Sequence, residues 1–313
     1  MKKIIIKLII YIPLVLLGLE ILIRTFNLTK DYPIRYVDEM GVEKWLPNQH
    51  GVSVTGIRRQ NASEFRINNS GFNSYREYTP SKETFEIALV GDSFIEGFHQ
   101  NYYNSIGKKI ENKLNGIQVY EYGYAGYDLA DELHLIHQYQ DAFNLIDLVF
   151  ISLEFETDLT RPNYTILGER MKLESPLYKA LRQCKLLVYM QTIGILDAPK
   201  SLFSKALSQD KNINIDHPSE EETHSNLEYF ENFKKLVNTY GFDKTRYIFL
   251  LDAEITPEAF LKYLKNNEFK YVDFSEILNN SKSSTTLLYD MHWNDHGREL
   301  IAKLISFYIT ENK

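Results

Sequence analysis

Short apolar runs of strand length recur along the chain, and stretches with helical periodicity separate them. The runs typical of buried strands are residues 85–90, 117–120, 146–153, 247–251 and 270–274. Helices are expected over residues 103–115, 129–143, 227–240, 257–264 and 296–309. Strands that are apolar throughout and alternate with helices indicate a parallel sheet covered on both faces. The sequence therefore predicts an α/β domain of three layers, α/β/α, with a central parallel sheet of about five strands.

The N-terminus carries a second constraint, because residues 4–23 are almost entirely apolar. A run of this length can cross the hydrocarbon core of a bilayer. Lys2, Lys3 and Lys7 lie on its N-terminal side, which predicts a cytoplasmic N-terminus and an extracytoplasmic remainder. We expect a single-pass anchor in the plasma (inner) membrane, since no small-x-small site follows the run, and a cleaved signal peptide is the alternative. Glu20 is expected to reach the interface and to be tolerated there without a function.

The remaining chain divides by its composition. Residues 1–28 form the expected anchor, and residues 29–84, which are polar and aromatic, form a lead-in of short strands and loops packed on the main domain. The main domain is expected over residues 85–313. Within it, residues 160–220 lose the alternation and hold several prolines, which predicts an insertion with short helices.

Charge and cysteine content exclude several classes of function. The 313 residues carry a net charge of −7, with no Lys/Arg block outside the N-terminus, so there is no electrostatic basis for binding nucleic acid. The single cysteine, Cys184, excludes an internal disulfide and a multi-cysteine metal site. We expect it to be a small buried apolar residue. Nothing in the sequence requires a metal or an organic cofactor.

The first strand leads directly into the tripeptide Gly91-Asp92-Ser93. In parallel α/β sheets, sites form at the carboxyl ends of strands. A serine at a strand-to-helix turn has an exposed hydroxyl, and the N–H groups of the helix start nearby can hold an oxyanion. The alternative is an ordinary helix N-cap. The G-x-S-x-G elbow is excluded, because Ile95 stands where that pattern requires glycine.

A candidate base for such a serine precedes the last helix, where Asp290 and His292 are separated by one residue. On an extended segment, residues i and i+2 point the same way, so Asp290 can orient the imidazole of His292 as a catalytic triad requires. The alternatives are a structural Asp–His pair or a helix cap by Asn294 or Asp295. His296 is expected to be a packing or capping residue.

Two glycines follow the second strand. Glycine permits a backbone N–H to approach a substrate oxygen closely, which makes Gly126 a candidate oxyanion donor. Gly123 is expected to serve only the turn between strand and helix.

Ser93, Gly126 and the Asp290-x-His292 pair occur in the order seen in the SGNH (GDSL-type) hydrolase superfamily, which the chain resembles. The resemblance covers roughly residues 66–310 and implies a flavodoxin-like fold. It implies that Ser93 is the nucleophile, that His292 and Asp290 complete the triad, and that the N–H groups of Ser93 and Gly126 bind the oxyanion. Residues 66–73 resemble a lead-in segment of membrane-anchored bacterial members.

The chain departs from this family pattern at two places. Thr157 stands where the third block of the family supplies an asparagine to the oxyanion hole. A threonine hydroxyl can also donate a hydrogen bond, but loss of one oxyanion donor typically costs about 2.7–4 kcal/mol. The Asp-x-His spacing, tighter than the usual Asp-x-x-His, resembles the acetyltransferase branch that modifies exopolysaccharides.

The resemblance implies a serine esterase or O-acyl(acetyl)transferase that works through a Ser93 acyl-enzyme, with Thr157 as a third oxyanion donor. The expected location favours ester-linked acyl groups of a cell-envelope or exported polysaccharide as substrate. Polysaccharide-assembly proteins are the expected partners, and lipid esters are the second class of substrate.

Two further interpretations stay open. A non-catalytic glycan-binding or assembly protein would keep the fold without the reaction, and the Thr157 departure favours it. A glycosidase would use the carboxylates of Glu154 and Glu156, but nothing in the sequence places them on opposite sides of a sugar.

Overall fold

The computed structural model describes residues 2–56, 59–195, 220–288 and 290–312. Five parallel strands form the central sheet: β5 (Phe85–Gly91), β6 (Ile117–Gly123), β7 (Leu148–Ser152), β8 (Tyr247–Leu251) and β9 (Lys270–Asp273). Their spatial order is β6-β5-β7-β8-β9, which is the flavodoxin-like order 2-1-3-4-5. The predicted sheet and its strand number are confirmed.

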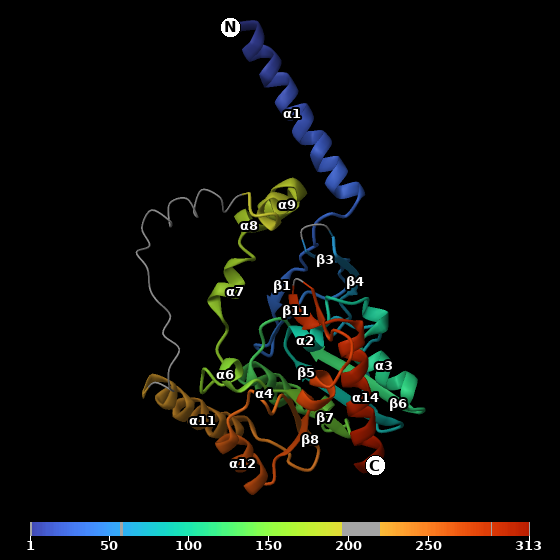
Figure 1. Cartoon of the computed structure of the whole chain (residues 1–313), viewed down its shortest axis with the longest axis vertical. Coiled ribbons are helices and arrows are strands. Elements are labelled where there is room, and N and C mark those ends of the chain that lie inside the picture. The colour runs from blue at the N-terminus through green and yellow to red at the C-terminus, as the bar shows by residue number, and fades with distance from the viewer. Residues whose placement is uncertain (1, 57–58, 196–219, 289, 313) are drawn as a thin grey trace.

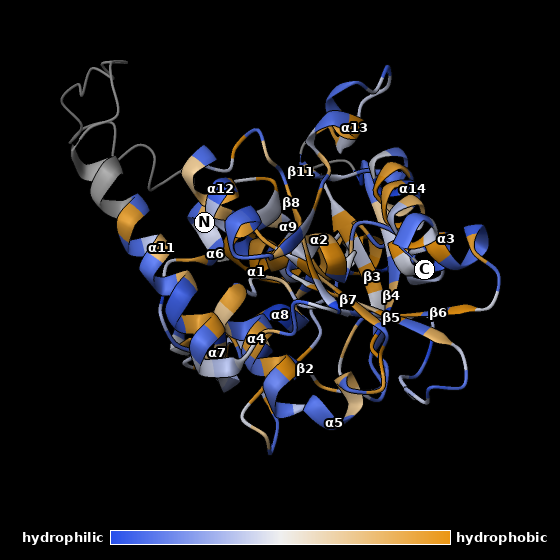
Figure 2. Cartoon of the chain, turned by 90° about the horizontal axis from the view of Figure 1, so that it is seen from below, coloured by the Kyte–Doolittle hydropathy of each residue, from blue (hydrophilic) through white to orange (hydrophobic). Residues whose placement is uncertain are grey.

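Helices cover both faces of this sheet. Helices α3 (Ile106–Lys113) and α14 (Asp295–Asn312) pack on one face, and α4 (Leu129–Gln138), α11 (Glu220–Tyr240) and α12 (Glu258–Asn266) pack on the other (Figures 1 and 2). Successive residues of a strand face opposite layers, so the fully buried Leu89 joins the α3/α14 core and Val90 joins the α4/α11 core. Burial on both faces explains why these strands are continuous apolar runs.

The lead-in segment forms two antiparallel pairs beside the sheet. Strand β1 (Arg35–Val37) pairs with β2 (Glu43–Trp45), and β3 (His50–Thr55) pairs with β4 (Asn61–Arg66). Its side chains Trp45, Phe65, Ile67 and Phe72 are buried in the same core as α4 and α11. The lead-in therefore packs on the α/β unit through a shared hydrophobic core.

The short helix α6 (Phe155–Asp158) precedes the insertion, whose described part contains the short helices α7 (Gly168–Lys172), α8 (Pro176–Gln183) and α9 (Lys185–Thr192). Helices α8 and α9 stand away from the sheet, beside the lower end of α1 (Lys2–Thr25) (Figure 1). Residues 196–219 of the expected insertion lie outside the described residues.

Helix α1 is apolar over Lys3–Thr25, and within this stretch Ile23 is buried whereas the most apolar 18-residue window is not, so by length and composition the helix could be a membrane span or a signal sequence. Near its end, the Glu20 carboxylate accepts the backbone N–H groups of Lys185 (3.0 Å) and Leu186 (2.6 Å). Arg24 pairs with the same carboxylate at 2.6 Å. The expectation that Glu20 is merely tolerated is therefore wrong, because it caps helix α9.

Cys184 also differs from its expectation. It is exposed rather than buried, and its sulfur lies 3.8 Å from the Glu20 carboxylate. It occupies the junction between α8 and α9.

Candidate active site

Ser93 is the first residue of the short helix α2 (Ser93–Glu96), immediately after strand β5. The Asp92 carboxylate caps this helix by accepting the Phe94 N–H at 2.9 Å. A side chain at Gly91 would collide with Ile95 and Ser152, so the tight strand-to-helix turn requires glycine there. Asp92 is thus the helix cap, and the adjacent Ser93 hydroxyl is directed elsewhere.

The structure brings Ser93, His292 and Asp290 together. Nε2 of His292 lies 2.7 Å from Oγ of Ser93, and Nδ1 of the same ring is hydrogen-bonded to the Asp290 carboxylate. Asp290 and His292 belong to strand β11 (Asp290–Trp293), which pairs with β10 (Thr286–Leu287). The His292 N–H donates to Asp290 at 2.9 Å, which fixes the carboxylate beside the ring. This is the arrangement of a Ser-His-Asp triad.

The electrostatics of Asp290 suit a partner for a histidine cation. Burial acts to raise its pKa, but the backbone N–H and the imidazole of His292 outweigh burial, and the pKa of Asp290 is lowered from its ordinary value. The carboxylate is therefore ionised at neutral pH, where it can fix the tautomer of His292 and stabilise the imidazolium.

A second histidine, His99, borders the triad and was missed by the sequence analysis. Its Nε2 lies 3.3 Å from the other oxygen of Asp290, and its ring stacks on His292 with centroids 4.0 Å apart. Burial lowers the pKa of His99 to about 4, so this ring is neutral at pH 7. No sequence pattern marks it, because it lies in the loop after α2 and meets Asp290 only in the fold.

His99, Asp290 and His292 are also the one set of side chains among the described residues whose ligand atoms lie close enough to hold a metal ion, within 4.8 Å of one another. The fit is poor. Both ring nitrogens of His292 are already used, by Ser93 and by Asp290. An ion would have to break the hydrogen bonds that align the triad.

Arg298 joins the two halves of the site from helix α14. Its side chain is fully buried, and it donates to the carbonyl of Phe94 (3.0 Å) and to the carbonyl of Trp293 (3.1 Å). These carbonyls directly follow Ser93 and His292. Burial lowers the pKa of Arg298 to about 10, so it remains charged at neutral pH. An arginine in a helix normally indicates a solvent-facing position, so this role could not be predicted from the sequence.

The lead-in segment also holds helix α2 in place, through hydrogen bonds to Glu96. The Asn73 amide donates to the carbonyl of Glu96 (2.8 Å), and Nε1 of Trp45 donates to its carboxylate (2.6 Å). The N–H of Ala125 donates to the same carboxylate at 3.0 Å. Burial raises the pKa of Glu96 to about 7. Residues 66–73, singled out in the sequence, therefore support the helix that carries Ser93.

The expected oxyanion donors are less closely gathered. Gly126 lies in the turn after β6 with φ +88°, and its carbonyl accepts a hydrogen bond from Arg170. The Thr157 hydroxyl donates to Asp158 at 3.1 Å. Among the described residues that line the cavity around Ser93, Ala125 appears but neither Gly126 nor Thr157 does.

Gly123 has a different role from the one expected. It is the last residue of β6, and a Cβ there would run into the backbone of Ile95 and Glu96. Only glycine lets β6 approach helix α2 this closely. Gly123 is thus a packing requirement of the site, beyond a simple turn.

A cavity of about 650 Å³ contains Ser93, Asp290 and His292, and we call it the Ser93 cavity. Its volume lies within the usual range for ligand sites. Its walls include residues 53–56 at the end of β3, residues 28–33 after α1, and Gln191 and Thr192 at the end of α9. Glu154, one of the alternative carboxylates, lines a different cavity.

The chain matches no protein-family model and, by sequence, no curated protein. Among solved structures it is similar to a lipolytic protein of the G-D-S-L family from Veillonella parvula DSM 2008, at 14% identity over 72% of this chain and 98% of that one, with a TM-score of 0.39. It is also similar to a lipase/acylhydrolase from Enterococcus faecalis, at 14% identity over 72% and 96% of the two chains (TM-score 0.40). A putative SGNH hydrolase from Slackia heliotrinireducens matches at 12% identity over 72% and 100% (TM-score 0.28).

Proposed function

We propose that the chain is a serine ester hydrolase or acyltransferase whose nucleophile is Ser93. The observation that carries the proposal is the 2.7 Å contact between Nε2 of His292 and Oγ of Ser93, with Nδ1 of the same ring bonded to an ionised Asp290. A serine hydroxyl needs such a base to become a nucleophile.

In the proposed reaction, Oγ of Ser93 attacks the carbonyl carbon of an ester while Nε2 of His292 takes its proton. The tetrahedral intermediate collapses, the ester C–O bond breaks, and His292 returns the proton to the leaving alcohol. Water or a sugar hydroxyl then gives its proton to His292 and attacks the acyl carbon. The bond between that carbon and Oγ of Ser93 breaks, and His292 returns the proton to Oγ, which regenerates the Ser93 hydroxyl. Water as acceptor gives hydrolysis, and a hydroxyl gives acyl transfer.

The developing oxyanion requires donors aimed at it. We assign this role to the N–H groups of Ser93, at the start of α2, and of Gly126 in the turn after β6. Thr157 is the third proposed donor, and its hydroxyl would have to turn away from Asp158 to take part.

The proposed setting is the outer face of the plasma membrane, with α1 as a single-pass anchor and the N-terminus in the cytoplasm. There the enzyme would remove acyl groups from, or add them to, a cell-envelope or exported polysaccharide, alongside polysaccharide-assembly proteins. The apolar helix α1 supports the membrane location, and the Asp290-x-His292 spacing favours acyl transfer.

The test uses the full-length protein in detergent, 4-nitrophenyl acetate and a fluorophosphonate probe. The parent should cleave the ester and carry the label on Ser93, and Ser93→Ala should lose both. Cleavage by Ser93→Ala at the parent rate would exclude the mechanism.

One alternative has its own observation. Thr157 donates to Asp158 and leaves the oxyanion site one donor short, which favours a glycan-binding protein without catalysis. Such a protein would neither react with the fluorophosphonate nor cleave the ester, and it would still bind polysaccharide.

A further inference from the structure

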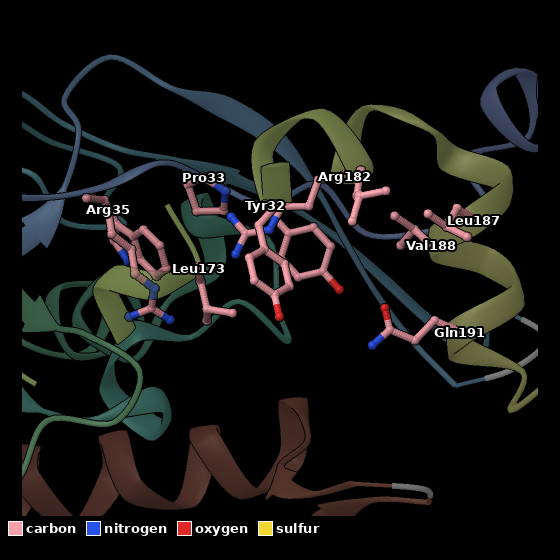
Figure 3. A pocket seen from close by; sticks show the side chains of 11 residues that line it. Tyr32, Pro33, Arg35, Leu173, Arg182, Leu187, Val188 and Gln191 are labelled. Carbon is pink, nitrogen blue, oxygen red and sulfur yellow. The ribbon is translucent and has the colours of Figure 1, made fainter. Parts of the chain in front are cut away.

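An apolar pocket of about 360 Å³ adjoins the Ser93 cavity. Five residues line both, and they form the passage between the two spaces: Tyr32, Pro33, Arg35, Trp45 and Gln191. The other side of the pocket is lined by leucine and valine side chains of the insertion and by Arg182. Figure 3 shows Leu187 and Val188 on one helix facing the segment that carries Tyr32 and Pro33. The Ser93 cavity therefore borders a pocket whose lining is mainly apolar and includes the cations Arg35 and Arg182.

The helix that closes this pocket is fixed to the apolar helix α1. Leu187, Val188 and Gln191 all belong to α9, and the Glu20 carboxylate caps the first turn of α9. Arg24 reinforces the joint, since it donates to Glu20 and to the carbonyl of Gln183. The pocket wall and the membrane-spanning candidate are thus one connected unit.

The neighbouring helix α8 presents an apolar face to its surroundings. Leu177 is 67% exposed and Tyr178, which also lines the pocket, is 48% exposed. The basic Lys179 and Arg182 lie on the same helix and pair with Glu174. Apolar and basic side chains on one short helix, beside the end of an apolar span, are typical of an element at the bilayer interface.

We propose that the apolar pocket binds the hydrocarbon chain of an amphiphilic ester drawn from the bilayer, with the ester carbonyl at Ser93. The proposal rests on the proposed function of Ser93 and names the acyl donor. An acetyl group would leave the pocket empty, whereas an acyl chain would extend past Trp45 and Gln191 and bury its methylenes against Leu187 and Val188. The acceptor, water or a glycan hydroxyl, reaches the acyl-enzyme through the open side of the Ser93 cavity.

The activity test compares 4-nitrophenyl acetate, butyrate, octanoate and decanoate on the full-length protein. Each buried methylene should raise kcat/KM by roughly fourfold until the pocket is full. Leu187→Glu places a carboxylate in the wall and should lower the decanoate-to-acetate ratio of kcat/KM by at least about tenfold. Ile195→Glu, exposed just beyond α9 and outside the pocket lining, is the matched control and should keep the parent ratio.

A binding test separates this proposal from the chemistry of Ser93. In the Ser93→Ala protein, a dodecanoate brominated near the chain end should quench the fluorescence of Trp45, which lines the passage. Leu187→Glu should weaken the binding at least about tenfold, and Ile195→Glu should not. Quenching in Ser93→Ala, combined with a parent protein that shows no esterase activity, would support the pocket and reject the proposed function. Absent quenching, or equal quenching in both glutamate variants, would overturn the pocket, as would a flat chain-length series in an active enzyme.

Discussion

The imidazole of His99 lies almost flat on the imidazole of His292, with ring centroids 4.0 Å apart and an interplanar angle of 22°. Because burial keeps the pKa of His99 at about 4, the ring is neutral when the triad works. A cation in this position would oppose the positive charge that His292 acquires during catalysis. The neutral ring instead fills the space and contacts the second oxygen of Asp290.

Replacing His99 separates the stacking of its ring on His292 from its contact with Asp290. His99→Phe keeps a stacked ring and loses the contact with Asp290, and His99→Ala loses both. We expect His99→Phe to lower kcat by up to roughly fivefold, the scale of one polar interaction of about 1 kcal/mol. The effect of His99→Ala should be larger, and KM should change little in both. Steady-state kinetics with 4-nitrophenyl acetate measure both constants. Equal kcat in the parent, His99→Phe and His99→Ala would show that His99 does not contribute to catalysis.

The stability of the fold should depend on pH through Glu96. Burial raises the pKa of Glu96 from 4.5 to about 7. Between these values the unfolded chain has released a proton that the folded chain retains, so the contribution of Glu96 to stability falls as pH rises through this window. Glu96→Gln keeps an acceptor for Trp45 and Ala125 and should remove that part of the slope. Urea unfolding at pH 5 and pH 7 measures it, with the exposed Glu83→Gln as control.

Arg298 should be required for both stability and activity. Arg298→Met leaves the carbonyls of Phe94 and Trp293 buried without their donor, which costs about 1–3 kcal/mol for each. Helix α2, which carries Ser93, and strand β11, which carries His292, would also lose the side chain that links them. Urea unfolding and ester hydrolysis should both show the loss, whereas Lys303→Met, exposed on the same helix, should change neither. If Arg298→Met unfolds at a lower urea concentration than the parent but retains full kcat, the role of Arg298 is structural only.

Removing the Glu20 carboxylate should loosen the start of helix α9. Loss of a helix cap costs about 0.5–2 kcal/mol, so in Glu20→Ala the amides of Lys185 and Leu186 should exchange with solvent roughly 2- to 30-fold faster. Hydrogen exchange of the full-length protein followed by mass spectrometry measures this. Glu169→Ala, exposed at the start of α7, should leave exchange in α9 unchanged.

Thr157→Ala tests the weakest of the proposed oxyanion donors. Removal of a working donor lowers kcat by about 10²–10³. Because the hydroxyl already donates to Asp158, we expect a decrease of less than about tenfold. A decrease in kcat of about 10²–10³ would show that the hydroxyl turns toward the substrate during catalysis.

Local patterns predicted the sheet well, for a physical reason. The strand Tyr247–Leu251 was predicted with its observed bounds, because a strand buried on both faces must be apolar throughout and polar residues flank it. The region 129–143 was less regular than predicted. It divides at Tyr139 into α4 and α5 (Gln140–Phe143), and nothing in the side-chain pattern marks the break.

Long-range contacts account for what the sequence analysis missed. Glu20 and Leu186 are 166 residues apart, and His99 reaches Asp290 only through the fold. Neither contact produces a periodic pattern in the sequence. Asp290 and His292 could be paired because their relationship is local, two residues along one strand, whereas the buried position of Arg298 depends on where three separate elements meet.

The cap that Glu20 places on α9 has a practical consequence for preparing this protein. A soluble version starting after Thr25 would lack the acceptor for the Lys185 and Leu186 N–H groups, and with it the brace on the helix that carries Gln191 and Thr192 into the Ser93 cavity. We therefore expect truncation to change the shape of the Ser93 cavity as well as solubility. For the proposed reaction, we expect lower rates from a truncated protein than from the intact chain, most strongly for substrates that need α9 in place.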